Sequence, residues 1–213
     1  LTRAERLQLA QSIHPLCAVR GLPGTHDVAL GVALFAALDA ARPTSITRIP
    51  RFNKATDDRR EDAQWDTVHG RPDIVLFEGW CVAARPTAPW TGPINERERR
   101  DDLDGTWARW TNAALQRDYP ALFDRIDSLL MIQVPSMQTV RDGRWRQEQA
   151  LWQNSQHGGG TVPLGLMTQQ QVDDYVALFE RLTTSTLAEM PSRADILLKH
   201  NVDFSQSLVR RPQ

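Results

Sequence analysis

Short apolar runs alternate with longer, helically periodic stretches along most of the chain. A short apolar run bounded by polar or turn residues is typical of a buried strand, and such runs predict strands at residues 46–49, 74–77, 127–134 and 194–198. Apolar positions with helical spacing predict helices at residues 2–19, 28–38, 95–117, 136–152 and 168–187. Strands that alternate with helices indicate an α/β fold with a mostly parallel sheet and helices on its faces.

The helix starts and the connecting segments carry further signals. Thr25 is the predicted cap of the helix at residues 28–38, with Asp27 in the first turn, where a negative charge is favoured. This helix is apolar on nearly all sides, which predicts that it is buried. Thr168 is the predicted cap of the last helix. We expect an Arg- and Asp-rich loop at 51–66, a Pro-rich loop at 83–93, a flexible connection at 157–160 and a polar tail after 198.

Composition places the chain among ordered globular proteins. Of its 213 residues, 41% are hydrophobic and 24% are charged, and neither a repeat nor a linker interrupts them, so we expect a single domain over residues 1–213. The net charge of −1 gives no basic field that would attract nucleic acid. No apolar run approaches the length of a membrane span, and no signal peptide is visible. The oligomeric state is left open.

Cysteine and histidine usage argues against a structural metal. Cys17 and Cys81 are isolated, which excludes a disulfide framework and a zinc site of the Cys-x-x-Cys type, and a reducing cytoplasm is the expected location. The remaining histidines outside the Gly24–Asp27 turn show no metal-ligand spacing. These are His14, His69, His157 and His200.

Glu78 and Gly79 follow the predicted strand at 74–77. Ligands of open α/β sheets bind beyond the carboxyl ends of the strands, so Glu78 is a candidate to act on a ligand or its metal ion. The alternative is a buried strand that ends in a solvated glutamate. The turn at residues 23–27, which contains His26 and Asp27, opens a helix and therefore suits an anion. An ordinary capped helix start is the alternative.

Two arginine-rich segments are further candidates. In the segment 50–59, Arg51, Lys54 and Arg59 are candidates to hold an anionic substrate, oriented by Asp57 or Asp58, unless the segment is only a solvated loop. In the segment 141–148, three arginines on a helix are candidates to close over phosphates, unless the helix is a charged surface element.

Helical spacing and charge alternation refine these readings. Arg141 shares a helix face with Trp145, whereas Arg144 and Arg146 point elsewhere. The alternating charges at 95–102 are typical of a solvated, salt-bridged helix.

A phosphate loop of the form G-x-x-x-x-G-K-[ST] is not found in this sequence. The loop needs a lysine directly after a glycine, and the lysines here, Lys54 and Lys199, follow Asn53 and Leu198.

Taken together, the segments resemble the D-glycerate 3-kinase family, the plant-type glycerate kinases, which are P-loop kinases related to uridine kinase and phosphoribulokinase. The most specific matches are Arg20-Gly-Leu-Pro-Gly-Thr-His-Asp27 and Phe77-Glu-Gly-Trp-Cys81. The other matching pieces, in the expected order, are Leu1-Thr-Arg-Ala-Glu-Arg6, Pro50-Arg-Phe-Asn-Lys54, Asp57-Asp-Arg59, Asn95-Glu96 and Trp145-Arg-Gln-Glu148.

The resemblance implies a P-loop kinase-like three-layer fold. It also implies Mg²⁺-dependent transfer of the ATP γ-phosphoryl group to a hydroxyl of D-glycerate, with 3-phosphoglycerate as the product. It implies that Glu78 and Lys54 are catalytic and that Glu78 also orients Mg²⁺. Lys54, Arg51 and Arg59 would hold the glycerate carboxylate or the transferred phosphate. His26 and Asp27 would line the substrate side, and Arg141 and Arg146 would contact the ATP phosphates, with Arg146 inside the matching W-R-x-E pattern. Asn53 departs from the acidic residue expected at its position.

In such kinases the phosphate loop and a following Asp-Asp-Phe/Tyr segment precede the part that resembles Leu1-Thr2-Arg3. The resemblance therefore implies an N-terminally incomplete kinase domain that lacks the N-terminal strand and phosphate loop, is inactive as given, and is only marginally stable because strand edges are left unpaired. Two alternatives stay open, namely a catalytically inactive kinase-like remnant and a related kinase for another small hydroxylated substrate.

Overall fold

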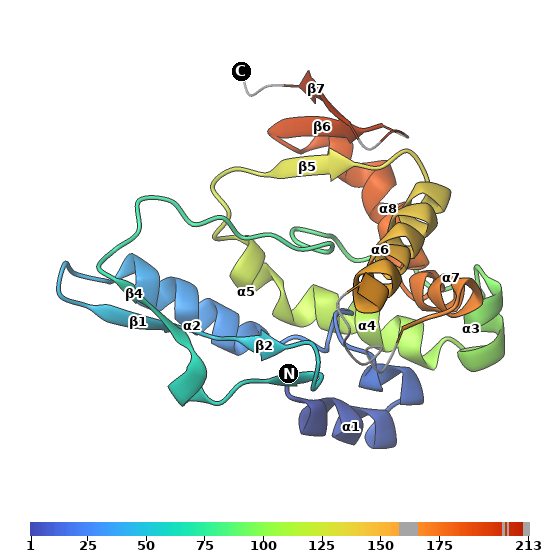
Figure 1. The fold of residues 1–213 in the computed structure, drawn as a ribbon, viewed down its shortest axis with the longest axis horizontal. Coiled ribbons are helices and arrows are strands. Elements are labelled where there is room, and N and C mark those ends of the chain that lie inside the picture. Colours follow the sequence, from blue (N-terminus) through green and yellow to red (C-terminus); the bar gives the residue numbers. More distant parts are fainter. Residues whose placement is uncertain (158–165, 202, 204, 211–213) are drawn as a thin grey trace. The chain divides into compact units, whose positions relative to one another are not determined.

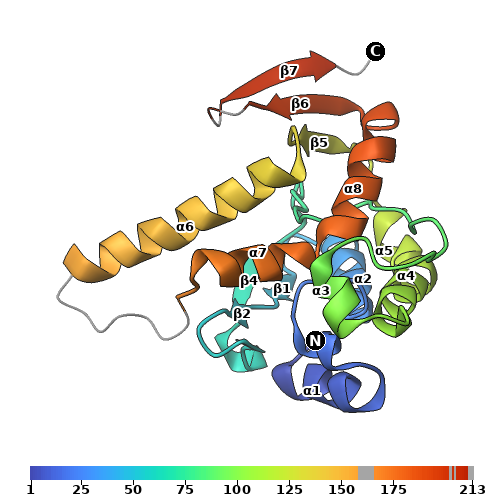
Figure 2. The ribbon, with the colours of Figure 1, turned by 90° about the vertical axis from the view of Figure 1, so that its right-hand side faces the viewer.

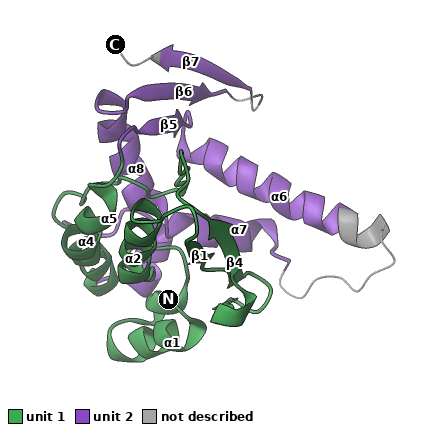
Figure 3. Cartoon of the chain, turned by 90° about the vertical axis from the view of Figure 1, so that its left-hand side faces the viewer, with its two compact units in different colours: residues 1–90, 104–126 green, residues 91–103, 127–213 purple. Residues whose placement is uncertain are grey.

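The computed structural model describes residues 1–157, 166–201, 203 and 205–210. These residues form two compact units, coloured separately in Figure 3. Unit 1 contains Leu1–Trp90 and Asp104–Ile126, and unit 2 contains Thr91–Leu103 and Asp127–Gln213. The single domain expected from the sequence stays a prediction. The expected flexible connection falls at 158–160 on residues outside the described part.

The start and the end of the first helix of unit 1 follow from the residues at its two ends. Helix α1 (Arg3–Ser12) begins with a capping box, in which Glu5 N–H donates to the Thr2 hydroxyl and Thr2 N–H donates to the Glu5 carboxylate. The prediction of one helix over 2–19 is wrong beyond Ser12, because Pro15 has no N–H for an α-helix and instead opens the 3-10 turn Pro15–Ala18.

Helix α2 (Val28–Asp39) is capped by Asp27, whose carboxylate accepts the Leu30 N–H at 3.0 Å. The prediction of Thr25 as the cap is therefore wrong. The predicted burial is wrong as well, since Leu38 is the helix's one buried residue. Figure 1 shows α2 alongside β1 (Ile46–Ile49), and it also contacts α5 (Pro120–Phe123).

The strand predicted at 46–49 is confirmed as β1, but its partner is unexpected. It pairs antiparallel with β4 (Asp66–His69), with Ile46 opposite His69. The segment between them, expected to be a loop, contains a second small hairpin of β2 (Phe52–Asn53) and β3 (Asp58–Arg59), followed by a 3-10 turn at Asp62–Gln64.

The strand predicted at 74–77 is wrong. These residues have no assigned secondary structure, and the exposed fractions of Ile74 and Leu76 are 78% and 91%. A strand needs a neighbour that takes up its backbone hydrogen bonds, and none of the strands within the described ranges pairs with this segment. Glu78 therefore follows an extended, exposed stretch rather than the end of a sheet strand.

The long helix predicted at 95–117 is divided between the two units. Helix α3 (Glu96–Asp101) belongs to unit 2 and helix α4 (Thr106–Asp118) to unit 1. Gly105 caps α4 with φ +72, and a Cβ there would lie 2.4 Å from the Trp90 ring. The break between α3 and α4 therefore lies next to a position that accommodates only glycine. Unit 1 buries residues of α4 and of the segment after it, namely Trp107, Ala108, Ala114, Leu115 and Tyr119.

Unit 2 holds a three-stranded sheet in the order β5–β6–β7 (Figure 2). Strand β5 (Leu130–Gln133) runs parallel to β6 (Ile196–His200), which confirms two of the predicted strands, and β7 (Gln206–Arg210) is an antiparallel strand in the predicted polar tail. The α/β class is confirmed. Within the part of the chain that the structure covers, the other strand pairs are antiparallel.

Helix α6 (Met137–His157) lies against α7 (Gln169–Ala177) in unit 2. The Thr168 cap is confirmed and forms a capping box with Gln171. The predicted helix at 168–187 is interrupted at Leu178 and Phe179, whose N–H groups donate to residues three positions back, and α8 (Glu180–Glu189) then follows, ending in a 3-10 turn at Met190–Ser192. Among the described helices, none is both long and apolar enough to span a bilayer.

Candidate active site

The centre of the candidate site is the turn that leads from Gly21 to Asp27. Two glycines in the left-handed region, Gly21 (φ +89) and Gly24 (φ +87), bend the backbone. The buried Thr25 closes the turn, because its hydroxyl donates to the Leu22 carbonyl at 2.7 Å and accepts the Gly21 N–H at 3.1 Å. Thr25 therefore shapes the turn and leaves the helix cap to Asp27.

Asp27 connects this turn to the β2–β3 hairpin. Its second carboxylate oxygen lies 2.5 Å from Arg59 Nη1, while the first caps α2. Burial acts to raise the pKa of Asp27, but the Arg59 guanidinium and the Leu30 N–H outweigh it, so that the pKa lies below its ordinary value. Asp27 is therefore a carboxylate that fixes Arg59 at the turn.

A second ion cluster lies at the tip of the hairpin. Asp57, which has a left-handed backbone (φ 56), pairs with the guanidinium of Arg20 and with Arg6 Nη2 at 2.6 Å. Both guanidiniums also stack on the Phe52 ring, 5.8 Å from its centroid for Arg6 and 5.5 Å for Arg20. Arg6 is 1% exposed, so this cluster anchors the hairpin to α1.

Sequence reasoning did not assign roles to Arg6 and Arg20. It proposed that Asp57 or Asp58 orients the cations of the segment. This is wrong, because the Asp57 side chain binds Arg6 and Arg20, and the Asp58 carboxylate accepts the backbone N–H groups of Arg3 and Arg59. The available signal was the position of Arg20 at the head of the R-G-x-P-G-T-H-D match.

His26 lies beside a buried tyrosine. Its Nδ1 is 2.6 Å from the Tyr119 hydroxyl, and the two rings meet edge to face with centroids 5.8 Å apart. The same hydroxyl accepts the Gly24 N–H at 2.9 Å. Burial lowers the pKa of His26 to about 4, so the imidazole is neutral at pH 7. Tyr119 is a second residue that sequence reasoning missed.

The two most specific motif segments meet in unit 1. The Trp80 indole N–H donates to the Gly21 carbonyl at 2.6 Å, which joins the Phe77–Cys81 segment to the turn that carries His26 and Asp27. Glu78, two residues before Trp80, is exposed. The structure thus places Glu78 in the segment that contacts the turn.

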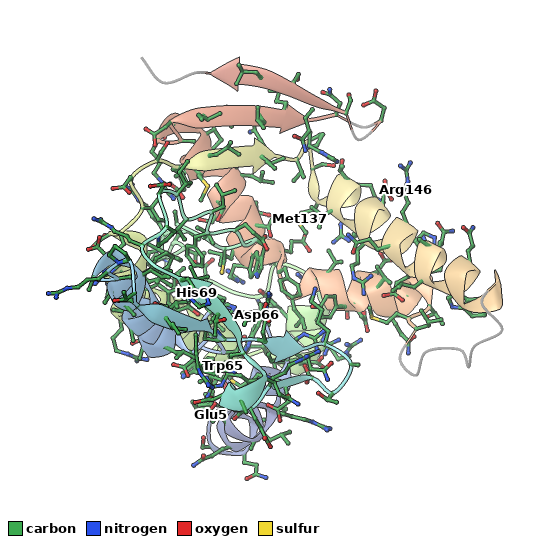
Figure 4. The ribbon with its side chains drawn as sticks, turned by 60° about the vertical axis from the view of Figure 1, so that its left-hand side comes forward. Glu5, Trp65, Asp66, His69, Met137 and Arg146 are labelled. Carbon is green, nitrogen blue, oxygen red and sulfur yellow. The ribbon has the colours of Figure 1, made fainter. Side chains whose placement is uncertain are left out.

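The other predicted residues of unit 1 lie farther from the turn along the hairpin. Arg51 pairs with Asp66 of β4, with Nε 2.6 Å from the carboxylate oxygen, and both side chains are more than half exposed. Figure 4 labels Asp66 beside Trp65 and His69. Lys54 is exposed in the loop between β2 and β3. Arg59 is therefore the predicted cation that the structure joins directly to Asp27 at the turn.

The predicted phosphate-contacting arginines lie on α6 of unit 2. Arg141 donates to Glu180 at 3.0 Å and lines a pocket of about 270 Å³ together with Trp145, as their shared helix face predicts. The other lining residues are Gln138, Asp142, Gln169 and Asp173. Arg144 points away from this pocket toward the buried Glu148, and Arg146 is exposed on α6 (Figure 4).

Known proteins similar to this chain were found in two of three comparisons. No protein-family model matches it. The kinase mug58 of Schizosaccharomyces pombe, itself described as uncharacterized, is 31% identical over 159 residues, which are 71% of this chain and 56% of that protein. The chloroplastic D-glycerate 3-kinase of Arabidopsis thaliana is 26% identical over 185 residues, 83% of this chain and 37% of the plant enzyme.

Solved structures agree with these relatives. A D-glycerate 3-kinase from Cryptococcus neoformans var. grubii superposes with a TM-score of 0.72 at 22% identity, over 98% of this chain and 76% of that one. The chain is similar in sequence to one D-glycerate 3-kinase and in fold to another. The YGR205w protein superposes with a TM-score of 0.66 at 21% identity, over all of this chain and 75% of that one.

The chain spans about half or less of the length of the curated relatives that it matches. The sequence has no lysine after a glycine, and the described residues contain no group of three carboxylate, histidine or cysteine side chains that could hold a metal ion. The residues of unit 1 offer a neutral histidine and a paired arginine at one turn, a combination that suits a small anion.

Proposed function

We propose that the protein takes part in ATP-dependent phosphoryl transfer to a hydroxyl of a small hydroxy acid, with D-glycerate as acceptor and 3-phosphoglycerate as product. The observation that carries the proposal is the junction of the two motif segments through Trp80 and Gly21, which brings together the two segments whose motifs resemble those of the D-glycerate 3-kinases. The named activities of the relatives support the choice of acceptor.

In this proposal the turn binds the acceptor. Arg59 uses Nη1 for Asp27, and no other protein partner of its guanidinium is recorded among the described residues, so its remaining donors suit a carboxylate. His26 and Asp27 line the same turn, and Lys54 in the neighbouring hairpin adds positive charge. Arg51, which is paired with Asp66, is the further proposed contact. Binding here would hold the acceptor in one orientation, which is the main contribution a kinase makes to phosphoryl transfer.

Fewer residues of this chain are candidates to bind the nucleotide than to bind the acceptor. ATP would supply the phosphoryl group and Mg²⁺ would neutralise its charge. Glu78 is the proposed residue for Mg²⁺ because its carboxylate is exposed in the segment joined to the turn. Arg141 and Arg146 on α6 are the proposed contacts to the ATP phosphates. A reducing compartment such as the cytoplasm is part of the proposal, supported by the free thiols of Cys17 and Cys81.

The test is an assay of ADP release with the protein purified from its native cells. We expect release that depends on D-glycerate, with 3-phosphoglycerate identified by mass spectrometry. Turnover with another hydroxy acid or a nucleoside would replace the substrate, and no turnover with any acceptor would favour the inactive remnant. For the 213-residue chain alone we expect no turnover.

Arg59→Ala is the variant that tests acceptor binding in the native-length protein. We expect the KM for D-glycerate to rise about tenfold or more, because a charge-assisted contact of about 1.5–3 kcal/mol is removed. Arg71→Ala is the matched control, since Arg71 also pairs with an aspartate but both side chains of that pair are more than 60% exposed. A KM that is unchanged in Arg59→Ala would move the acceptor away from this turn.

A further inference from the structure

The strongest unassigned feature is the contact between the buried Tyr119 and the turn. Tyr119 is 2% exposed and lies between α4 and α5. Its hydroxyl makes hydrogen bonds within unit 1 with Gly24 N–H at 2.9 Å and with His26 Nδ1 at 2.6 Å. A single buried oxygen therefore contacts both the backbone of the turn and the one histidine on it.

The direction of these bonds follows from counting protons. A backbone N–H can only donate, so the Tyr119 oxygen accepts from Gly24, and the phenol has one proton of its own to donate. Among the recorded contacts of the described residues, His26 Nδ1 is the acceptor available to that proton. If Nδ1 carried a proton instead, the phenolic proton would be buried without a partner, at a cost of about 1–3 kcal/mol.

We propose that Tyr119 is a positioning residue that holds His26 as the neutral Nε2–H tautomer, so that His26 donates a hydrogen bond from Nε2 to an oxygen of the bound hydroxy acid and does not act as a base. This inference rests on the proposed function of the turn. The lone pair of the imidazole lies on Nδ1, where it is occupied by Tyr119, so Nε2 has no lone pair with which to accept the substrate's proton.

The neighbouring groups leave Nε2 to a ligand. Both carboxylate oxygens of Asp27 are engaged, one with Leu30 N–H and the other with Arg59. No partner for Nε2 of His26 is recorded within residues 1–157, 166–201, 203 and 205–210. Burial keeps the imidazole neutral by lowering the pKa of His26 to about 4, and burial also raises the pKa of Tyr119, which keeps the phenol protonated. The Nε2–H of His26 on the turn and the guanidinium of Arg59, which Asp27 holds at the turn, would thus both present hydrogen-bond donors there.

The test is the tautomeric state of His26, measured by ¹H–¹⁵N NMR of histidine-labelled protein and assigned by the signal lost in His26→Asn. At pH 7 we expect a pyrrole-type nitrogen at Nε2 and a pyridine-type nitrogen at Nδ1. In Tyr119→Phe we expect mixed tautomers, because the phenolic proton that Nδ1 accepts is removed. Tyr175→Phe, which alters the chain's other tyrosine in unit 2, should leave the signals unchanged.

The outcomes separate this inference from the proposed function. An Nδ1–H tautomer or an imidazolium in the wild-type protein at pH 7 would overturn the role of Tyr119, whatever the substrate is, and this reading stands even if Tyr119→Phe fails to fold. Addition of D-glycerate should then shift the Nε2 signal. If the tautomer is as expected but the Nε2 signal does not shift when D-glycerate is added, acceptor binding by His26 is overturned. The effect of Tyr119 on the tautomer would still hold.

Discussion

At the scale of single residues, the turn from Gly21 to Asp27 contains two glycines with the same backbone and different surroundings. Gly21 and Gly24 have φ values of +89 and +87. A Cβ on Gly21 would meet nothing within 4 Å, whereas a Cβ on Gly24 would lie 2.4 Å from Trp110 Cη2. The pair therefore separates the cost of an unfavourable backbone from the cost of a steric clash.

Gly21→Ala should reduce the free energy of unfolding by about 1 kcal/mol, since only left-handed strain is added. Gly24→Ala should cost a further ~1–3 kcal/mol because the Trp110 ring has to move. Urea denaturation of both variants measures the difference. Equal losses of unfolding free energy in the two variants would mean that the Trp110 ring can move aside without destabilising the protein.

His26 makes stability depend on pH in a defined window. Its folded pKa is about 4 and the unfolded value is about 6.5, so between these values the unfolded chain binds more protons than the folded one. Stability is therefore expected to fall as the pH drops from about 6.5 to about 4, by at most about 3 kcal/mol. Urea midpoints across this range should show the slope, and His26→Asn, which cannot titrate, should flatten it.

At the scale of elements, helix α3 shows why a charge pattern alone misleads. The alternating residues 95–102 form the predicted surface pairs, such as Arg97 with Asp101. Glu98 is different, since it is 1% exposed, lies 2.9 Å and 2.5 Å from two nitrogens of Arg181, and accepts the Ile94 N–H. The charged segment 95–102 thus contains a buried ion pair through Glu98 and a buried Asp102 beside solvated charges such as Glu96.

Glu98→Gln should destabilise unit 2 by about 3–5 kcal/mol, because Arg181 would be left largely buried without its carboxylate. Glu96→Gln in the same helix is the control. Glu96 is 78% exposed and pairs with Arg99, so its loss should change stability by less than about 0.5 kcal/mol. Similar effects of the two variants in urea denaturation would show that Glu98 contributes no more than a surface charge.

The elements that the sequence predicts correctly are those whose partners lie in the described chain. Strands β1, β5 and β6 fall where their apolar runs are, whereas 74–77 fails because no described strand pairs with it. In the site, His26, Asp27 and Arg59 were predictable from local patterns. Tyr119 was not, because it meets His26 across 93 positions, and Asp57 meets Arg6 across 51, distances over which no spacing rule operates.

At the scale of the whole molecule, the exposed run at 74–77 is the main liability. Its four residues Ile74, Val75, Leu76 and Phe77 are between 39% and 91% exposed and adjacent in sequence. Contiguous exposed apolar residues in an extended segment favour association with other chains. We expect the 213-residue chain to be marginally stable, and a cooperative melt above about 55 °C would contradict this.

Leu76→Lys should slow aggregation of the chain at 37 °C several-fold with little change in melting temperature, because Leu76 is 91% exposed and its loss removes no packing. Leu103→Lys is the matched control, since Leu103 is 65% exposed but flanked by aspartates. Light scattering follows both variants. Equal protection by the two would indicate a general effect of added charge.

The two buried cysteines are a natural probe of how often unit 1 opens. Cys17 and Cys81 are 0% and 6% exposed, both belong to unit 1, and they are the chain's two cysteines. Burial raises the pKa of Cys81 to about 12, so the native thiol is unreactive toward alkylating reagents. The rate at which a thiol reagent modifies the protein under native conditions therefore reports how often unit 1 opens, without any contribution from unit 2 and without an engineered label.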